Sequence, residues 1–157
     1  MNVIKWWVDA SFGVHPDFRS HMGAMMTMGS GAFQSFSKKQ KLNTRSSNES
    51  ELVALDDVSV HIMWTNLFLE HHGYRVDKNI VFQDNKTSIL LEINGLKSAG
   101  KRSRAINLRY VWITDQIKKG NVSVEYCPTG EMKADFFTKP LVGAKIFRFR
   151  KSILVEK

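Results

Sequence analysis

Two short apolar stretches that each end on an aspartate constrain this sequence most. The first runs from Val3 to Asp9 and the second from Asn79 to Asp84. Apolar runs of this length are typical of strands buried in a sheet that helices cover. Turn chemistry explains one such aspartate, but two of them indicate a site at the carboxyl edge of a sheet, where open α/β sheets bind ligands. Neighbouring carboxylates repel each other unless cations lie between them, so we expect a divalent-metal site.

The length of the chain favours a single domain. We expect residues 1–157 to form it, with a core over about 1–140 and a C-terminal helical extension over about 141–157. No apolar run reaches the roughly 20 residues of a membrane span, and the pattern of a signal peptide is missing. A lone Cys127 allows no internal disulfide and fits a reducing compartment. We therefore expect an intracellular, cytoplasmic protein that is not secreted and has no membrane partner.

The charge of the chain favours nucleic acid or another acidic partner. Lys and Arg number 23 against 15 acidic residues, which gives a formal net charge of +8. Basic residues gather in two connections, at 38–45 and at 97–104. A solvated surface explains each cluster as well as a binding role does.

Periodicity and turn residues predict an α/β fold. The expected strands span 3–9, 20–28, 32–38, 79–84 and 122–127, and the expected helices span 47–72, 86–94, 104–118, a segment around 132–137, and 142–154. The first three strands form an antiparallel meander. Right-handed crossovers then place the fourth strand beside the first. We predict a mixed five-stranded sheet, three antiparallel strands plus two parallel, flanked by helices.

The segment 47–72 is the strongest helix in the sequence. Its apolar stripe consists of Leu55, Val58, Ile62 and Leu69. Glu51 lies on the same face, so its carboxylate is expected to point toward the sheet. Ser46, Ser47 and Asn48 all offer N-cap oxygens at its start. Asn48 and Glu51 also have the spacing of a capping box, and a capping role for Glu51 is the alternative.

Two other patterns concern the core. Four methionines of the second expected strand are interpreted as core residues: Met22, Met25, Met26 and Met28. In the last expected strand, Val122, Val124 and Tyr126 alternate with Ser123 and Glu125, which predicts that the first three are buried.

Four acids could meet at one site. Asp9 and Asp84 end their strands, Glu51 faces inward, and Asp135 is chosen by its position beside Phe136 and Phe137. Four carboxylates around two Mg²⁺ ions about 4 Å apart are what two-metal phosphodiester hydrolysis requires. Hard oxygen ligands favour Mg²⁺, and Mn²⁺ is expected to substitute for it.

Six motifs make the chain resemble the ribonuclease H domain of copia-type, Pseudoviridae-like LTR retrotransposon polyproteins. They occur in this order: Val8–Ser11, Ser35–Gln40, Ser46–Ala54, Gln83–Asn85, Arg102–Tyr110 and Ala134–Leu141. The resemblance implies the ribonuclease H fold and Mg²⁺-dependent cleavage of the RNA strand of RNA/DNA hybrids during reverse transcription. It carries Asp9, Glu51, Asp84 and Asp135 over as catalytic acids. It also implies a reverse transcriptase domain in the same polyprotein and a place in virus-like particles.

The RNA/DNA hybrid implied as substrate suggests further site residues. Small polar side chains near the acids are expected to contact 2′-hydroxyl groups, namely Ser11, Ser47, Asn48 and Asn85. Basic side chains are expected to bind phosphates, namely Lys38, Lys39, Lys101, Arg102 and Arg104.

One departure from the family pattern keeps an alternative open. Ala105 stands where the family usually has His after its basic pair. The chain is therefore either an active nuclease or a catalytically impaired nucleic-acid-binding module of the same fold. An integrase core shares the fold and the metal chemistry, but Glu92 follows Asp84 too closely to serve as its third acid.

Overall fold

A computed structural model describes residues 2–94 and 112–155 of the chain. Its elements are β1 (Val3–Ser11), β2 (His21–Thr27), β3 (Gln34–Lys39), α1 (Ser47–His71), β4 (Lys78–Gln83), α2 (Lys86–Asn94), β5 (Ser123–Tyr126), η2 (Thr129–Glu131), α4 (Asp135–Thr138) and α5 (Ala144–Leu154). Residues 112–118 are also helical, which agrees with the end of the helix predicted over 104–118.

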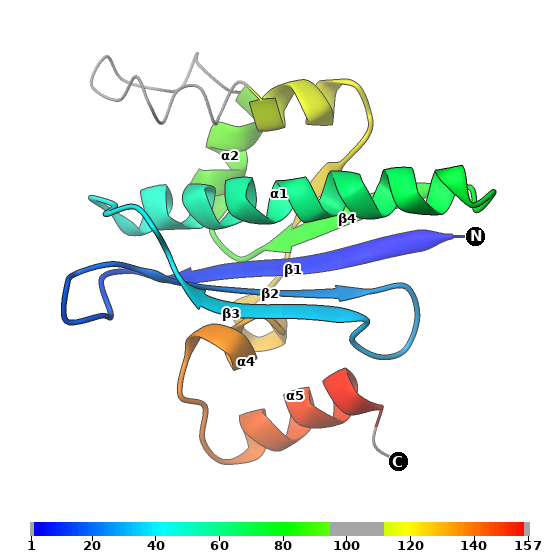
Figure 1. Cartoon of the computed structure of the whole chain (residues 1–157). Coiled ribbons are helices and arrows are strands. Elements are labelled where there is room, and N and C mark those ends of the chain that lie inside the picture. The colour runs from blue at the N-terminus through cyan, green and yellow to red at the C-terminus, as the bar shows by residue number, and fades with distance from the viewer. Residues whose placement is uncertain (1, 95–111, 156–157) are drawn as a thin grey trace.

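The five strands form one mixed sheet in the order β3-β2-β1-β4-β5. β1 pairs with β2 and β2 with β3 in antiparallel fashion, while β1 with β4 and β4 with β5 are parallel. Both the predicted sheet and the predicted position of the fourth strand beside the first are confirmed. Figure 1 shows α1 lying along one face of this sheet and α4 and α5 on the other.

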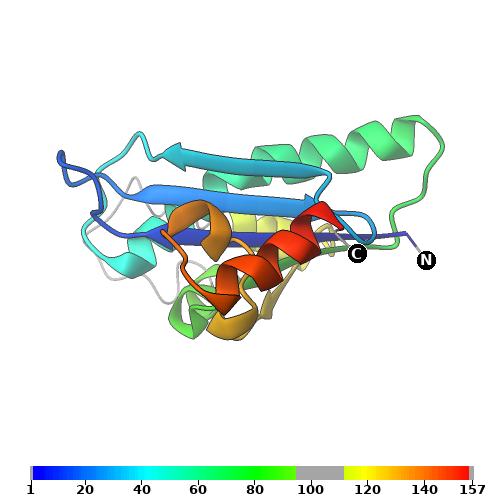
Figure 2. The same cartoon turned by 90° about the horizontal axis from the view of Figure 1, so that it is seen from below.

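The two faces of the sheet bury two separate cores. Because side chains alternate along a strand, Trp6 and Val8 of β1 face α1, where they join Leu55, Val58 and Ile62 of the predicted stripe. The opposite face buries a second cluster: Trp7, Met25, Cys127, Met132, Ala134, Phe149 and Ile153. Figure 2 shows α4 and α5 crossing this second face. Helices thus cover both faces of the sheet at β1, the strand that carries Asp9.

The long helix α1 is a core helix. By length and composition alone it would suit a membrane span. Its Leu55, Val58 and Ile62 side chains are fully buried against the sheet, so core packing explains part of its apolar character. Other large apolar side chains of the helix are exposed, namely Val60, Trp64, Leu67 and Phe68.

The start of α1 corrects the predicted capping box. Ser46 is the N-cap, and its side chain accepts a hydrogen bond of 3.2 Å from the Glu49 backbone N–H. Glu49 in turn accepts one of 2.7 Å from the Arg45 backbone N–H. Of the three candidate N-cap residues, Ser46 is therefore the one used, and the alternative in which Asn48 and Glu51 form a capping pair is excluded, because the helix begins two residues earlier. Glu51 is left one turn inside the helix, free of any capping role.

Two predicted core residues are exposed. Met28 lies beyond the end of β2 and is 43% exposed. Tyr126 is the last residue of the edge strand β5 and is 46% exposed, with the Lys86 ammonium 4.7 Å from its ring centroid. Both predictions of burial were wrong because the two residues lie at the margin of the sheet, one past the end of a strand and the other at the end of an edge strand.

The helix predicted around 132–137 is shorter than expected. A 3₁₀ turn, η2, ends at Glu131, and Met132 has an extended backbone (φ −68°, ψ 95°) that separates it from α4. Met132 is fully buried. Anchoring this side chain in the second core interrupts the helix and lets α4 begin at Asp135.

Candidate active site

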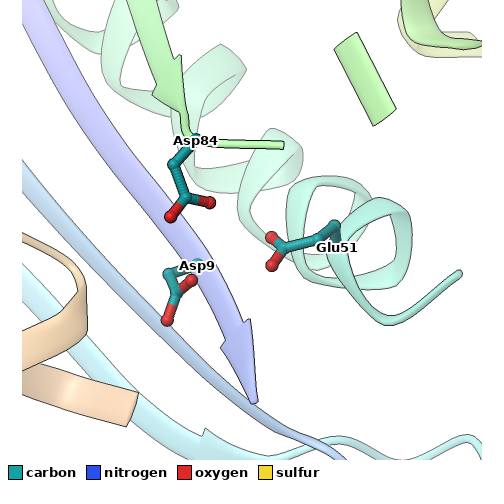
Figure 3. A group of neighbouring side chains, drawn as sticks. All are labelled: Asp9, Glu51 and Asp84. Atoms are coloured by element: carbon teal, nitrogen blue, oxygen red, sulfur yellow. The ribbon is translucent and has the colours of Figure 1, made fainter. Parts of the chain in front are cut away.

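Three carboxylates converge at the carboxyl edge of the sheet. Asp9 lies near the end of β1, Asp84 directly follows β4, and Glu51 projects from the second turn of α1. One oxygen from each of the three lies within 4.8 Å of the other two. Figure 3 shows the three side chains pointing toward one another. The parallel pairing of β1 with β4 brings the two strand ends together, and α1 supplies the third acid from above the edge.

Only one of the two carboxylate oxygens of Glu51 accepts a hydrogen bond from the described residues. Its Oε1 accepts a hydrogen bond of 3.2 Å from the Ala10 backbone N–H. Its Oε2 is buried and has no hydrogen-bond partner among the described residues. Burial, followed by the charges of Asp9 and Asp84, raises the pKa of Glu51 well above its ordinary value. A buried carboxylate oxygen without a donor is a position that a cation would satisfy.

Asp9 is buried at the centre of the site. The Thr138 hydroxyl donates a hydrogen bond to its Oδ2, and the Lys139 ammonium lies 3.5 Å from Oδ1 and 3.4 Å from Oδ2. Burial raises the pKa of Asp9, and the charge of Lys139 with the Thr138 hydrogen bond opposes that rise. For Asp9 as for Glu51, burial is the largest cause of the raised pKa, and the charge of Lys139 offsets only part of it.

Asp84 and its neighbour Asn85 connect three elements. The Thr129 hydroxyl donates a hydrogen bond of 2.9 Å to Oδ2 of Asp84. The Asn85 amide donates one of 2.7 Å to Oδ1 of Asn48 on α1. Its own oxygen accepts from the backbone N–H groups of Thr87 and Ser88 at the start of α2. The end of β4 is thereby fixed against both α1 and η2.

Asp135, the fourth predicted acid, has a different environment. It is buried at the start of α4, yet it is not one of the three clustered carboxylates. Its Oδ1 lies 2.5 Å from the Lys139 ammonium and its Oδ2 lies 2.6 Å from the Lys145 ammonium. Lys139 thus bridges Asp9 and Asp135.

The predicted substrate-contacting residues divide into three groups. Ser11, Ser47 and Asn85 line an open hollow of about 580 Å³ together with the three clustered acids, and Asn48 bonds to Asn85 beneath it. Two basic residues of β3, Lys38 and Lys39, do not line this hollow, and the Lys39 ammonium is paired with Asp17 at 2.8 Å. The remaining predicted residues and the departure from the family pattern lie outside the described residues: Lys101, Arg102, Arg104 and Ala105.

The site also contains residues that sequence analysis did not identify. Thr138, Lys139 and Lys145 all contact the acids, and Lys86 lines the hollow. Burial lowers the pKa of Lys139, but Asp9 and Asp135 outweigh it and raise that pKa overall. The four-residue spacing from Asp135 to Lys139, which brings side chains together on a helix, was the available signal. Lys145 had none, because the chain reverses around Gly143 before reaching it.

Comparison with known proteins agrees with this geometry. No protein-family model matches the chain. The Pol polyprotein of transposon TNT 1-94 from Nicotiana tabacum is 30% identical over 138 residues, which are 87% of this chain and 10% of the polyprotein. That of transposon RE1 from Arabidopsis thaliana is 28% identical over 146 residues, 92% of this chain and again 10% of the polyprotein. The chain therefore spans about a tenth of the length of these relatives.

Solved structures show the same fold at low sequence identity. The N-terminal RNase H domain of rv2228c from Mycobacterium tuberculosis has a TM-score of 0.63 at 11% identity, over 97% of this chain and 99% of that one. LC11-RNase H1, solved in complex with an RNA/DNA hybrid, has a TM-score of 0.60 at 14% identity, over 85% of this chain and 92% of that one. The prototype foamy virus protease–reverse transcriptase has a TM-score of 0.54 at 10% identity, over 96% of this chain and 19% of that one. The chain is therefore homologous to a segment of retrotransposon Pol polyproteins and has the ribonuclease H fold.

Proposed function

We propose that this chain is the ribonuclease H domain of a copia-type retrotransposon and hydrolyses the RNA strand of RNA/DNA hybrids during reverse transcription. The observation that carries the proposal is the convergence of Asp9, Glu51 and Asp84 at one sheet edge, with an unpartnered buried oxygen on Glu51. In a ribonuclease H fold, that arrangement supports a metal-dependent endonuclease. The domain would span residues 1–157, with α5 as its C-terminal extension.

The residues present fit a divalent cation. All the donors are carboxylate oxygens, a set that favours Mg²⁺ and also accepts Mn²⁺. Asp9, Glu51 and Asp84 would hold one ion, and Asp135 with Asp9 would hold a second. Such a pair, when bound, supplies a lowered pKa for the attacking water and positive charge opposite the leaving oxygen.

The chain's own contribution is to hold these acids in a fixed arrangement. The Ala10 backbone N–H orients Glu51, Thr138 orients Asp9, and Thr129 orients Asp84. Carboxylates held in advance need no reorganisation when the reaction begins, which is the general source of electrostatic catalysis.

Substrate choice would come from the rim of the hollow. Ser11, Ser47 and Asn85 offer short polar groups next to the acids, and Asn48 would act with them. Hydroxyl and amide groups of this kind can recognise the 2′-hydroxyls that distinguish a hybrid from duplex DNA. The phosphate contacts would come from Lys38, Lys39, Lys101, Arg102 and Arg104, which add affinity without sequence preference.

A reverse transcriptase domain of the same polyprotein is the proposed partner. The relatives are about ten times longer than this chain, and the foamy virus structure carries the same fold within a protease–reverse transcriptase. An intracellular site of action, within cytoplasmic virus-like particles, follows from that assignment.

Ala105 supports a second candidate, a binding module that has lost turnover. One experiment separates the two functions: Mg²⁺-dependent cleavage of a labelled RNA/DNA hybrid, measured beside duplex DNA and single-stranded RNA. Cleavage of the hybrid alone, abolished by Asp84→Asn, is the expected result. Cleavage only by Ala105→His would mean that Ala105 disables an otherwise complete site. Tight hybrid binding without cleavage by either protein would favour the binding module.

A further inference from the structure

Two lysine ammonium groups contact Asp135, one at each carboxylate oxygen. Lys139 lies 2.5 Å from Oδ1 and Lys145 lies 2.6 Å from Oδ2. Lys139 alone also reaches Asp9, at 3.4 Å. The space between Asp9 and Asp135, where a second divalent ion would need both carboxylates, is therefore held by the Lys139 ammonium.

The backbone around Lys139 fixes this placement. The preceding residue, Thr138, donates a hydrogen bond to Asp9, and the Lys139 backbone N–H donates one of 3.0 Å to the carbonyl oxygen of Asp135. The backbone carbonyl of Thr138 also accepts from Ser11 at 3.1 Å. These hydrogen bonds fix the backbone at Lys139 beside Asp9 and Asp135, so its side chain starts within reach of both carboxylates.

The charges of the site point the same way. With all four acids ionised, Asp9, Glu51, Asp84 and Asp135 carry four negative charges. The two lysines on Asp135 offset two of them. One divalent cation neutralises the remaining two charges. Within the part of the chain that the structure describes, the carboxylate oxygen of these four acids that is buried without a hydrogen-bond partner belongs to Glu51. A second divalent ion bound beside both lysines would leave the cluster with excess positive charge.

We infer that Lys139 takes the place of one of the two cations in the protein without nucleic acid, so that Asp9, Glu51 and Asp84 bind one divalent ion and Asp135 binds none. The inference rests on the proposed metal site and adds that the Lys139 ammonium competes with the second ion for Asp135. Two-metal hydrolysis then requires the Lys139 ammonium to leave Asp135 before that carboxylate can hold an ion.

Counting bound ions tests this directly. Mn²⁺ is titrated into the whole chain without nucleic acid, and the free ion is measured by its paramagnetic resonance signal. The unsubstituted chain is expected to bind about one ion, and Lys139→Met about two, as in two-metal sites. Lys139→Arg, which keeps the charge, should again bind about one. Lys145→Met is the matched control: it removes a lysine that contacts Asp135 but not Asp9, so about one ion is expected.

Three results would overturn the inference. The first is binding of two ions by the unsubstituted chain, and the second is an unchanged number of bound ions in Lys139→Met. The third is a second bound ion in Lys145→Met, because that result would mean that the loss of any lysine charge suffices. The Lys139 side chain is 39% exposed, so its loss opens no core cavity, and Lys139→Gln provides a second neutral variant. Binding of no Mn²⁺, or binding that survives Asp84→Asn, would instead refute the proposed metal site itself.

Discussion

Asp9 and Gly23 lie directly opposite each other across the antiparallel pair of β1 and β2. A side chain at Gly23 would lie on the same face of the sheet as the Asp9 carboxylate. That space is filled by α4, since a Cβ added at Gly23 would lie 2.6 Å from Cγ2 of Thr138 and 2.9 Å from the carbonyl oxygen of Ala134. The missing side chain therefore lets α4 bring Thr138 and Lys139 onto Asp9.

Gly23→Ala is expected to loosen this contact. The Ala134 carbonyl is backbone and cannot turn aside, so α4 must move, at a cost of about 1–3 kcal/mol as in other overpacked sites. Chemical denaturation measures the loss of stability, and hybrid cleavage should fall with it as the acids lose their arrangement. Gly29→Ala is the control, because a Cβ there meets nothing within 4 Å. Equal stability of the two variants would contradict the tight packing of α4.

Glu51→Gln is expected to weaken the dependence of stability on both pH and metal. The pKa of Glu51 is raised well above its ordinary 4.5 by burial, so the folded metal-free protein retains a proton that the unfolded chain releases. Its stabilising contribution is full below about pH 4.5 and is lost as pH rises toward the folded pKa. In EDTA at pH 7, Glu51→Gln should therefore melt at a higher temperature than the unsubstituted chain.

Added Mg²⁺ should reverse that order. At about 100 times its Kd, a ligand of the folded state adds about 2.7 kcal/mol, and Glu51→Gln should lose most of this gain. Thermal unfolding in EDTA and in Mg²⁺ measures both effects, with the exposed Glu125→Gln as the control. The same Mg²⁺ gain in Glu51→Gln and Glu125→Gln would remove Glu51 from the site.

The sheet and three of its acids could be predicted because local patterns specify them. Apolar strands ending on Asp9 and Asp84, together with the handedness of crossovers, place those two side by side. Glu51 followed from the helical stripe. The helix start was harder, because Ser46 with Glu49 and Asn48 with Glu51 both match a capping box, and only the observed backbone at Ser46 decides between them.

The contacts of α4 could not be predicted from local patterns. Thr138 reaches Asp9 over 129 positions of sequence, and this requires the close approach of α4 at Gly23. Lys145 reaches Asp135 from the first turn of α5, which follows Gly143 with its positive φ of 64°. Such contacts are tertiary, and no periodicity in the sequence encodes them.

Glu92 is a second source of pH-dependent stability, independent of metal. It is fully buried on α2, and burial raises its pKa from 4.5 to about 8. Its contribution is therefore full below about pH 4.5 and falls as pH rises to about 8, by on the order of 3 kcal/mol at pH 7. Glu92→Gln should flatten the stability–pH curve over that window, as measured by urea unfolding. If the slope of stability against pH is the same in Glu92→Gln as in the unsubstituted chain, or if Mg²⁺ changes that difference, Glu92 is not a metal-independent source of pH-dependent stability.

Charge reversal in the predicted basic loop tests the nucleic-acid surface. Lys101→Glu with Arg102→Glu should weaken hybrid binding at low salt, because each lost phosphate contact removes the release of counterions. The slope of log K against log salt should become shallower by up to about 2 if both residues contact phosphates. Fluorescence anisotropy with a labelled hybrid over a salt series measures it. Lys119→Glu serves as the control, since Lys119 is already paired with Asp115 at 2.6 Å. Affinity and slope equal to those of the unsubstituted chain would place the hybrid away from residues 101 and 102, and would leave Lys38 and Lys39 of β3 as the phosphate contacts to test next.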